Sequence, residues 1–283
     1  MKIISSIEDM KNEMREFRCQ NKTKGFVPTM GYLHEGHLSL VRECVKKSDY
    51  SVVSIFVNPA QFGPGEDFED YPRDFQRDSE ILRNEGVDCL FYPSNEEMYP
   101  QGYKTYVQVY DLKNKLCGRS RPHHFTGVCT VVLKLFHIVN PHQAFFGQKD
   151  FQQAVILKRM IRDLNLDVNL RVLPIVREEG GLAVSSRNTY LTPEQRKAAL
   201  RLYQSLQEAQ RMVDQGERKS QNIIQIMKKN IESEPEAQID YIKIVDTENL
   251  DPLSELNQDA LVALAVFIGK VRLIDNTIIK PEG

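Results

Sequence analysis

Two histidines, His34 and His37, lie three residues apart in the stretch FVPTMGYLHEGHLSLV, residues 26–41. If a strand ends here and a helix begins near His37, the helix offers unpaired N–H groups and a partial positive charge. Gly36 would let the backbone approach a ligand closely. The pattern predicts a phosphate site, in preference to capping or surface histidines. Zinc is a weaker alternative, because the spacing is not HExxH and no third ligand is evident.

A second stretch, NPAQFGPGEDFEDYPRD (58–74), carries side-chain amides at Asn58 and Gln61. Amides donate to and accept from small polar groups. Taken alone, a solvated loop with an Asn58-Pro59 turn is the simpler interpretation. A polar loop of roughly 15 residues favours a function, because such loops are uncommon in compact domains.

Two further stretches carry cations suited to phosphate oxygens. In FGQKDFQQ (146–153), Lys149 is a mobile point charge, and Asp150 could cap the following helix. In GGLAVSSRN (180–188), two hydroxyls adjoin a guanidinium, a set that can clamp β- and γ-phosphates. These three residues are Ser185, Ser186 and Arg187. The alternative is a polar linker with a helix cap, but a linker after the apolar LAV run does not need this set.

The stretch CGRSRPHHF (117–125) is basic and predicts a surface arm near the site. Arg121 is interpreted as a contact either to phosphate or to a second copy of the chain, and the sequence leaves both open. His123 and His124 could suggest a metal. Adjacent loop histidines are more often solvated, so we assign them no metal.

The elements that must position these groups follow from hydrophobic periodicity. Strands are expected at 25–29, 50–58, 87–93, 143–147 and 168–176. Helices are expected at 36–48, 74–86, 127–140 and 150–165, the second closed by Gly86. This alternation predicts an α/β fold, a Rossmann-like doubly wound parallel sheet. Ligands then bind outside the carboxyl ends of the strands.

The regular alternation of strand and helix patterns ends at about residue 187. Thr192 caps an expected helix that has Pro193 at its first position and runs to 216. A helix near 219–233 and strand-like runs at 239–246 and 261–276 follow. We therefore predict two domains: a Rossmann-like domain over residues 1–180 and a smaller α+β C-terminal domain over residues 181–283.

Composition excludes several classes of protein. The 283 residues are 41% hydrophobic and 27% charged, and the net charge of -2 gives no basic field for nucleic acid. The N-terminus lacks the apolar region of a signal peptide, and the longest apolar run, 260–269, is too short to span a bilayer. No CxxC pair occurs, so a reduced, cytoplasmic compartment is expected. The five cysteines are Cys19, Cys44, Cys89, Cys117 and Cys129.

HxGH is the motif of the nucleotidylyltransferase superfamily, and over nearly its whole length the chain resembles the pantothenate synthetase (pantoate–β-alanine ligase) family. PTMGYLHEGHLSLV matches that family's ATP-site motif. Six more matches follow in the same order: SIFVNPAQF (54–62), YPR (71–73), HFTGV (124–128), FGQKDFQQ (146–153), SSRNTYL (185–191) and RLIDN (272–276).

The resemblance implies an enzyme that condenses (R)-pantoate with β-alanine through pantoyl adenylate, using ATP and releasing AMP and pyrophosphate. It implies catalytic roles for His37, His34 and Lys149. The implied ATP-binding residues are Met30, Gly31, Tyr32, Leu33, His34, Glu35, Gly36, His37, Gly147, Gln148, Lys149, Asp150, Val176, Val184, Ser185, Ser186 and Arg187. Pantoate and β-alanine are assigned to Gln61, Gln153 and Asn58.

Mg²⁺ is expected on the ATP phosphates with no protein ligand assigned. A homodimer is the family expectation, with neither nucleic acid nor membrane as a partner. A carboxylate is already a nucleophile at pH 7, so the enzyme's task is charge stabilisation. His37 is expected to donate a hydrogen bond or a proton at the reacting phosphate. The C-terminal domain is expected to act as a lid that excludes water from the adenylate.

The chain departs from the family pattern at His123, where Gly is usual, at Gln148, where Glu is usual, and at Gly180, where Asp is usual. These changes put local loop conformation and one charge in doubt.

Two alternative functions remain. One is another nucleotidylyltransferase on the same fold, which would lack NPAQF together with FGQKDFQQ. The other is a non-catalytic nucleotide-binding protein, against which the complete set of cationic residues argues.

Overall fold

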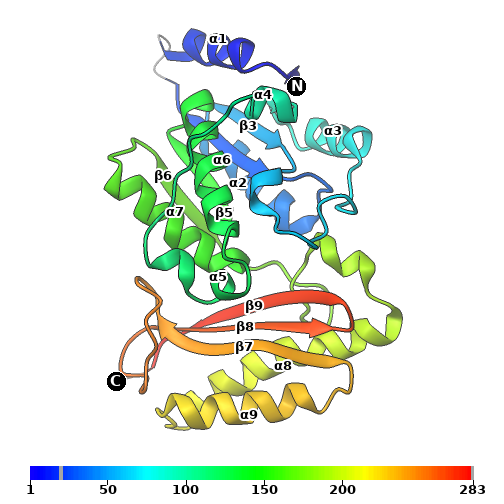
Figure 1. The fold of residues 1–283 in the computed structure, drawn as a ribbon, viewed down its shortest axis with the longest axis vertical. Helices are drawn as coiled ribbons and strands as arrows, with labels where there is room; N and C mark the ends of the chain where they lie inside the picture. Colours follow the sequence, from blue (N-terminus) through cyan, green and yellow to red (C-terminus); the bar gives the residue numbers. More distant parts are fainter. Residues whose placement is uncertain (19–21, 282–283) are drawn as a thin grey trace. The chain divides into compact units, whose positions relative to one another are not determined.

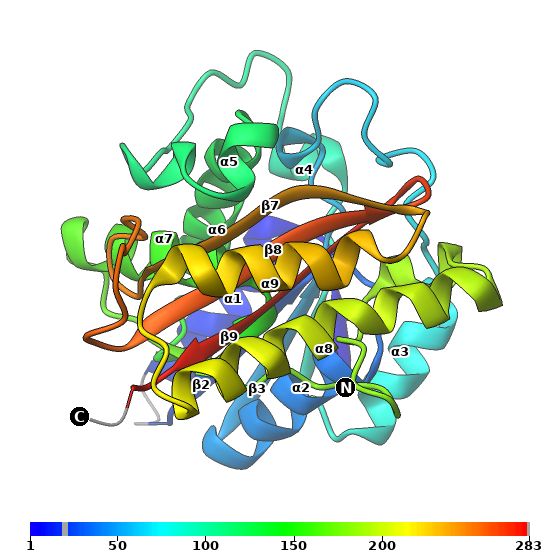
Figure 2. The same cartoon turned by 90° about the horizontal axis from the view of Figure 1, so that it is seen from below.

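The computed structural model describes residues 1–18 and 22–281, so Cys19 lies outside the described residues. The chain forms two compact units, and Figures 1 and 2 show their elements. The first comprises Met1–Asn114, Arg121–Gly147 and Ile156–Pro174. The second comprises Lys115–Ser120, Gln148–Val155 and Ile175–Gly283.

The first unit is built on a six-stranded sheet in which every pair of neighbours is parallel. Its strands are β1 (Lys2–Ile4), β2 (Lys24–Thr29), β3 (Tyr50–Ile55), β4 (Cys89–Phe91), β5 (Gln143–Gly147) and β6 (Asn169–Leu173), in the order β1-β4-β3-β2-β5-β6. The strand order reverses between β2 and β5, and such a switch point opens a ligand crevice at the carboxyl ends of the strands. The predicted doubly wound parallel sheet is confirmed.

In the first unit, alternate side chains along the strands point to opposite faces of the sheet, where helices pack against them. These helices are α1 (Ile7–Arg18), α2 (Glu35–Lys47), α3 (Phe75–Asn84), α4 (Asn95–Met98), α6 (His124–Val139) and the later turns of α7 (Phe151–Asp163). Val27, Val53 and Leu90, aligned on β2, β3 and β4, share a core with residues of α2 and α3. Successive strand side chains point to opposite faces. Cys89 accordingly lies against Met10 of α1.

Several expected boundaries change. The strand expected at 50–58 ends at Ile55, because Asn58 caps the short helix η1 (Pro59–Gln61). The strand expected at 87–93 is limited to Cys89–Phe91. The sequence patterns predict neither β1 nor α1, since the charged N-terminal stretch hides an amphipathic helix that buries Met10 and Met14.

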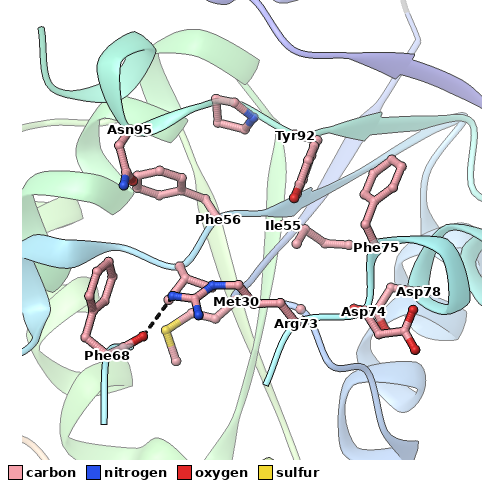
Figure 3. Close-up of a pocket in the computed structure, with 13 residues that line it drawn as sticks. Met30, Ile55, Phe56, Phe68, Arg73, Asp74, Phe75, Asp78, Tyr92 and Asn95 are labelled. Atoms are coloured by element: carbon pink, nitrogen blue, oxygen red, sulfur yellow. Dashed lines mark hydrogen bonds between the residues drawn. The ribbon is translucent and has the colours of Figure 1, made fainter. Parts of the chain in front are cut away.

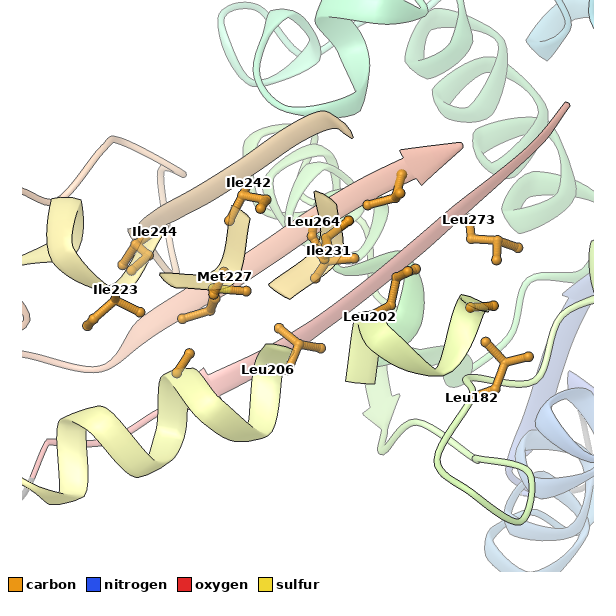
Figure 4. Packing of buried hydrophobic residues seen from close by; sticks show 14 of the residues in the cluster. Leu182, Leu202, Leu206, Ile223, Met227, Ile231, Ile242, Ile244, Leu264 and Leu273 are labelled. Atoms are coloured by element: carbon orange, nitrogen blue, oxygen red, sulfur yellow. The ribbon is translucent and has the colours of Figure 1, made fainter. Parts of the chain in front are cut away.

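The second unit contains an antiparallel sheet of β7 (Ala237–Asp246), β8 (Ala260–Ile268) and β9 (Val271–Ile279). The apolar run expected as one strand at 261–276 is two strands, because the chain reverses at Gly269, whose φ is +57°. Helices α8 (Pro193–Asp214) and α9 (Ser220–Glu232) enclose an apolar core with the sheet (Figure 4). The predicted cap is confirmed: Thr192 forms a capping box with Gln195.

The other face of this sheet carries polar side chains. Asp240 of β7 accepts hydrogen bonds from Arg272 of β9 and from Ser120 of the short helix α5 (Cys117–Ser120). Asn276 of β9 bonds to the short helix η3 (Gln148–Asp150). Within the second unit, segments 115–120 and 148–155 are therefore held on a polar surface opposite the apolar core.

The four described cysteines are buried, and none forms a disulfide with another described residue. Burial raises the pKa of the Cys44, Cys89 and Cys129 thiols to about 12, because a thiolate there would be desolvated. These three thiols are therefore protonated and unreactive at neutral pH. Among the described residues, no helix is long and apolar enough to cross a membrane.

Candidate active site

His34 and His37 lie where β2 gives way to α2. His34 is the residue before α2, with an extended backbone (φ −139°, ψ 172°), and its carbonyl accepts hydrogen bonds from the N–H groups of His37 (2.8 Å) and Leu38 (3.0 Å). The two imidazole rings stack, with centroids 4.0 Å apart and planes 23° apart. The paired rings thus stand at a helix N-terminus, which carries the partial positive charge that favours anions.

The loop between Met30 and His34 has an unusual backbone. Gly31 (φ +82°) and Tyr32 (φ +49°) are both left-handed. A Cβ at Gly31 would lie 2.9 Å from the Ile55 side chain, so only glycine fits without displacement. The Asp78 carboxylate accepts hydrogen bonds from the backbone N–H groups of Tyr32 (2.6 Å) and Leu33 (2.9 Å). Asp78 therefore fixes the backbone of the loop that leads to His34.

Asp78 and Arg77 of α3 are site residues that the sequence did not reveal. Asp78 is only 1% exposed, and burial raises its pKa although the loop N–H groups and Arg77 oppose that shift. Arg77 donates to the Leu33 carbonyl at 2.8 Å and lies 5.3 Å from the Tyr32 ring centroid. The one available signal was their position in the first turn of α3, soon after the polar loop.

Gln61 and Asn58 form a buried amide pair. Asn58 donates to Gln61 Oε1 (3.1 Å) and to the Gly127 carbonyl (3.1 Å), while Tyr99 donates to Asn58 Oδ1 (2.7 Å). Gln61 Nε2 lies 3.0 Å from the sulfur of Met30. Asn58 is thus engaged on all sides within the first unit, and its contacts orient Gln61 beside the loop that precedes α2.

Helix α6 approaches η1 very closely at Gly127. A Cβ there would lie 2.2 Å from the Ala60 carbonyl oxygen, which excludes any side chain. One turn earlier, the ring of His124 contacts the Gln61 carbonyl at 3.0 Å through Nδ1. Arg121 pairs with Glu66 of the polar loop. Burial opposes ionisation of Glu66, but the Arg121 guanidinium outweighs it and keeps the pKa of Glu66 below its ordinary value.

A cavity of about 180 Å³, open to solvent, lies at the carboxyl ends of β3 and β4 (Figure 3). Met30 and Gly31 form one wall, and the end of the polar loop with the first turn of α3, from Phe68 to Asp78, forms another. Arg73 on that loop donates to the Phe68 carbonyl at 2.8 Å, the bond drawn in Figure 3. The cavity shares only Met30 and Gly31 with the predicted ATP-binding residues and includes neither histidine.

In the second unit, Lys149 lies in η3, which continues directly from β5. Its ammonium is 3.9 Å from the Asp150 carboxylate and its side chain is 22% exposed. Asn276 of β9 donates to the carbonyls of Gln148 (3.0 Å) and Lys149 (2.9 Å), while Gln148 Nε2 donates back to Asn276 Oδ1 (3.3 Å). With Gln in place of the family's Glu at position 148, the side chain can donate to Asn276 Oδ1, which a carboxylate could not do.

Residues 176–184 form a tight hairpin. The Val184 N–H donates to the Val176 carbonyl (3.0 Å), and Arg177 pairs with Ala183 as an isolated bridge. Gly180 (φ +95°) makes the turn and Gly181 (φ +101°) follows it. An Asp at position 180 would be strained there, so the second departure from the family pattern suits this turn. The third, His123, has φ −96° and imposes no backbone strain.

The hairpin leads into η4 (Ser186–Tyr190), which carries the hydroxyl and guanidinium cluster. Ser185 caps η4 by accepting from the Arg187 N–H at 3.3 Å. Asn188, buried, donates to Glu178 (2.9 Å) and to the Ala183 carbonyl (3.0 Å). The cluster is therefore anchored to the hairpin through Asn188, a residue that the sequence interpretation did not single out.

The predicted residues fall into two groups. Those of the first unit are Met30, Gly31, Tyr32, Leu33, His34, Glu35, Gly36, His37, Asn58, Gln61 and Gly147, and those of the second are Gln148, Lys149, Asp150, Gln153, Val176, Val184, Ser185, Ser186 and Arg187. Gln152, which had no expected role, is buried and bonds to Cys117 N (2.9 Å) and to the Lys115 carbonyl (2.6 Å). It holds segment 115–120 in place.

Comparisons with known proteins agree on one family. A family model described as pantoate-beta-alanine ligase matches residues 2–278. A pantothenate synthetase of Thermotoga petrophila is 57% identical over 99% of this chain and 100% of its own length, and one of Caldicellulosiruptor bescii is 51% identical over the full length of both chains.

Solved structures give the same picture. The crystal structure of pantothenate synthetase from Thermus thermophilus has a TM-score of 0.95 and 44% identity, covering 99% of this chain and 100% of that one. The pantoate-beta-alanine ligase of Francisella tularensis, complexed with beta-gamma ATP and beta-alanine, has a TM-score of 0.82 and 35% identity. The matched parts are 98% of this chain and 97% of that one.

Proposed function

This chain belongs to the pantoate-beta-alanine ligase family, and from that premise we propose how it works. The enzyme condenses (R)-pantoate with β-alanine to give pantothenate. ATP is the co-substrate, and the reaction passes through pantoyl adenylate. The observation that carries the proposal is the stacked His34–His37 pair at the N-terminus of α2, directly after the switch-point strand β2.

In the first half-reaction, a carboxylate oxygen of pantoate attacks the α-phosphorus of ATP. The bond from that phosphorus to the bridging oxygen breaks, and pyrophosphate leaves with the electron pair. In the second, the amine of β-alanine attacks the acyl carbon of the adenylate. The acyl C–O bond breaks, AMP leaves, and the amine loses a proton. No covalent enzyme intermediate is needed, because pantoate supplies the nucleophile already ionised.

His34, His37 and the N-terminus of α2 stabilise charge on the phosphates. The backbone N–H groups and dipole of α2 favour an anion, and His37 donates a hydrogen bond or a proton at the reacting phosphate. Preorganised donors of this kind are each worth about 10²–10³ in rate. The surrounding loop residues Met30 to Leu33 shape the nucleotide site, and Asp78 holds their backbone.

The second unit provides the groups for the departing pyrophosphate. Lys149 contributes a positive charge, and Ser185, Ser186 and Arg187 clamp the β- and γ-phosphates. Val176 lies beside the adenine, and Val184, joined to it by a backbone hydrogen bond, contacts ATP through its backbone. Gly147, Gln148 and Asp150 complete the ATP-binding segment.

Gln61, Gln153 and Asn58 are proposed to recognise pantoate and β-alanine. Gln61 makes the direct contact with both substrates, through an amide whose orientation is set by Asn58. Gln153 lies in the first turn of α7 and serves pantoate. We propose that Asn58, whose polar atoms are engaged by protein groups, acts through Gln61.

Mg²⁺ would enter on the ATP phosphates and neutralise part of their charge. No protein ligand is assigned to the ion. A boundary near residue 180, a lid role for residues 181–283, a homodimer and a cytoplasmic location also remain proposals.

Pantoate-dependent exchange of labelled pyrophosphate into ATP tests the proposal. The enzyme should catalyse this exchange without β-alanine, and adding β-alanine should give AMP and pantothenate by mass spectrometry. Another nucleotidylyltransferase would exchange with a different acid, so a panel of acceptor acids separates that alternative. Nucleotide binding without turnover of any acid would refute the proposal.

A further inference from the structure

Two adjacent polar residues of β9, Asp275 and Asn276, are almost completely buried, at 3% and 4% exposure. Burying a carboxylate and an amide is costly unless both are hydrogen-bonded. Successive residues of a strand point to opposite faces, so the two side chains serve different neighbours. Both neighbours are ATP-binding segments of the second unit in the proposed function.

Asn276 binds η3 through its whole amide group. Nδ2 donates to two successive carbonyls, those of Gln148 and Lys149, at 3.0 and 2.9 Å. Oδ1 accepts from Gln148 Nε2 at 3.3 Å. Fixing these two carbonyls fixes the two peptide planes on either side of the Lys149 Cα atom, and with them the direction in which the Lys149 side chain leaves the backbone.

Asp275 binds the hairpin through Arg177. The guanidinium makes two parallel hydrogen bonds to the carboxylate, at 2.6 and 3.0 Å, and a third to the Gly181 carbonyl at 3.0 Å. Arg177 also lies 4.2 Å from the Tyr203 ring centroid. The carboxylate in turn accepts the backbone N–H of Asn276 at 2.7 Å, which ties the two halves of the pair together.

We propose that Asp275 and Asn276 are a positioning pair for ATP: Asn276 orients Lys149, and Asp275 orients the hairpin that bears Val176 and Val184. Neither residue touches the substrate. This inference rests on the proposed role of Lys149 as a phosphate ligand. Its physical basis is preorganisation: a backbone held before ATP arrives need not be ordered on binding.

The amide of Asn276 is suited to this role in a way that a carboxylate is not. In Asn276→Asp, a group of the same shape would turn oxygen atoms toward the Gln148 and Lys149 carbonyls, and both hydrogen bonds would be lost. Asn257, exposed in the same unit, provides the matched control Asn257→Asp.

A double-mutant cycle tests the inference. ATP affinity and kcat/KM for ATP are measured for wild type, Asn276→Asp, Lys149→Ala and the double variant. We expect Asn276→Asp to weaken ATP about 10- to 100-fold, with the KM for β-alanine little changed and Asn257→Asp like wild type. In the Lys149→Ala background the further loss should fall to less than about threefold, because coupled residues are not additive.

Equal losses of ATP affinity in the wild-type and Lys149→Ala backgrounds would overturn the inference and give Asn276 a merely structural role. Normal ATP binding by Asn276→Asp would also overturn it. If Asn276→Asp does not fold, Asn276→Ser, which keeps one donor, replaces it in the same cycle. Failure of the proposed function is distinguishable, since wild type would then show no pantoate-dependent pyrophosphate exchange.

Discussion

The loop before α2 and the η3 segment after β5 make an informative comparison. Each follows a strand of the switch point, and each carries cationic or hydrogen-bonding side chains proposed for phosphate. The first presents its histidines on a helix N-terminus and is held by Asp78 of the next helix along the chain. The second is held by Asn276, which lies 127 positions downstream of Lys149.

The difference teaches that the two halves of the proposed ATP site depend on different lengths of chain. In the first half the anchor Asp78 lies 46 positions from Tyr32, and its anchoring bonds use backbone N–H groups. The second half depends on side-chain and carbonyl bonds to β9, the edge strand that pairs antiparallel with β8. Substitutions in the first half should therefore act mainly on the chemical step. Substitutions around the second half should act mainly by displacing the groups proposed to bind ATP.

The largest effect is expected in the first half, from His37→Ala. Removing a donor at the reacting phosphate should lower the rate of pantoate-dependent pyrophosphate exchange by about 10²–10³. His137→Ala, an exposed histidine at the end of α6, is the matched control and should leave exchange unchanged. Undiminished exchange in His37→Ala would remove this histidine from the mechanism.

Lys149→Ala probes the second half. Loss of the ammonium should lower kcat/KM for ATP by about 10- to 100-fold, since charge-assisted hydrogen bonds are worth about 1.5–3 kcal/mol. Steady-state kinetics with varied ATP measures it. Lys158→Ala, an exposed lysine further along α7, should be normal. Equal losses in both variants would mean that general charge, rather than this position, governs ATP use.

A smaller and more selective effect is expected from Gln61→Ala. Removing the amide should raise the KM values for pantoate and β-alanine roughly tenfold, in keeping with loss of about 1–2 kcal/mol of hydrogen bonding. The KM for ATP should change less. Gln101→Ala, an exposed glutamine, serves as the control. Equal weakening of all three substrates would contradict the assignment of Gln61.

The smallest effect concerns the anchor Asp78. Burial raises its folded-state pKa, so its contribution to stability is fully present below the unfolded-state pKa and is lost as pH rises through the folded value. Wild type should therefore lose free energy of unfolding relative to Asp78→Asn as the pH rises above the ordinary aspartate pKa of about 3.9, by roughly 1.4 kcal/mol per unit of pKa shift. Urea unfolding at several pH values measures this difference. A difference that is flat or of opposite sign would be inconsistent with the raised pKa.

The sequence was sufficient for the parallel sheet, whereas the roles assigned to the candidate site residues stay predictions. HxGH at a strand–helix junction and the regular alternation of strands and helices are local patterns, so both could be predicted. Asp78, Arg77 and Asn276 were missed because an anchor has no local pattern: its role exists only in its long-range partners. The division of 261–276 into β8 and β9 was missed because apolar residues continue on both sides of Gly269, which hides the turn there.

The most direct test of the account uses pantoate labelled with ¹⁸O in both carboxylate oxygens, supplied with ATP and β-alanine. If that carboxylate attacks the α-phosphorus and the acyl C–O bond later breaks, one ¹⁸O atom must pass to the phosphate of AMP and one must stay in pantothenate. Mass spectrometry of AMP reads this directly. AMP without ¹⁸O, or the label in inorganic phosphate with ADP as the co-product, would contradict the account.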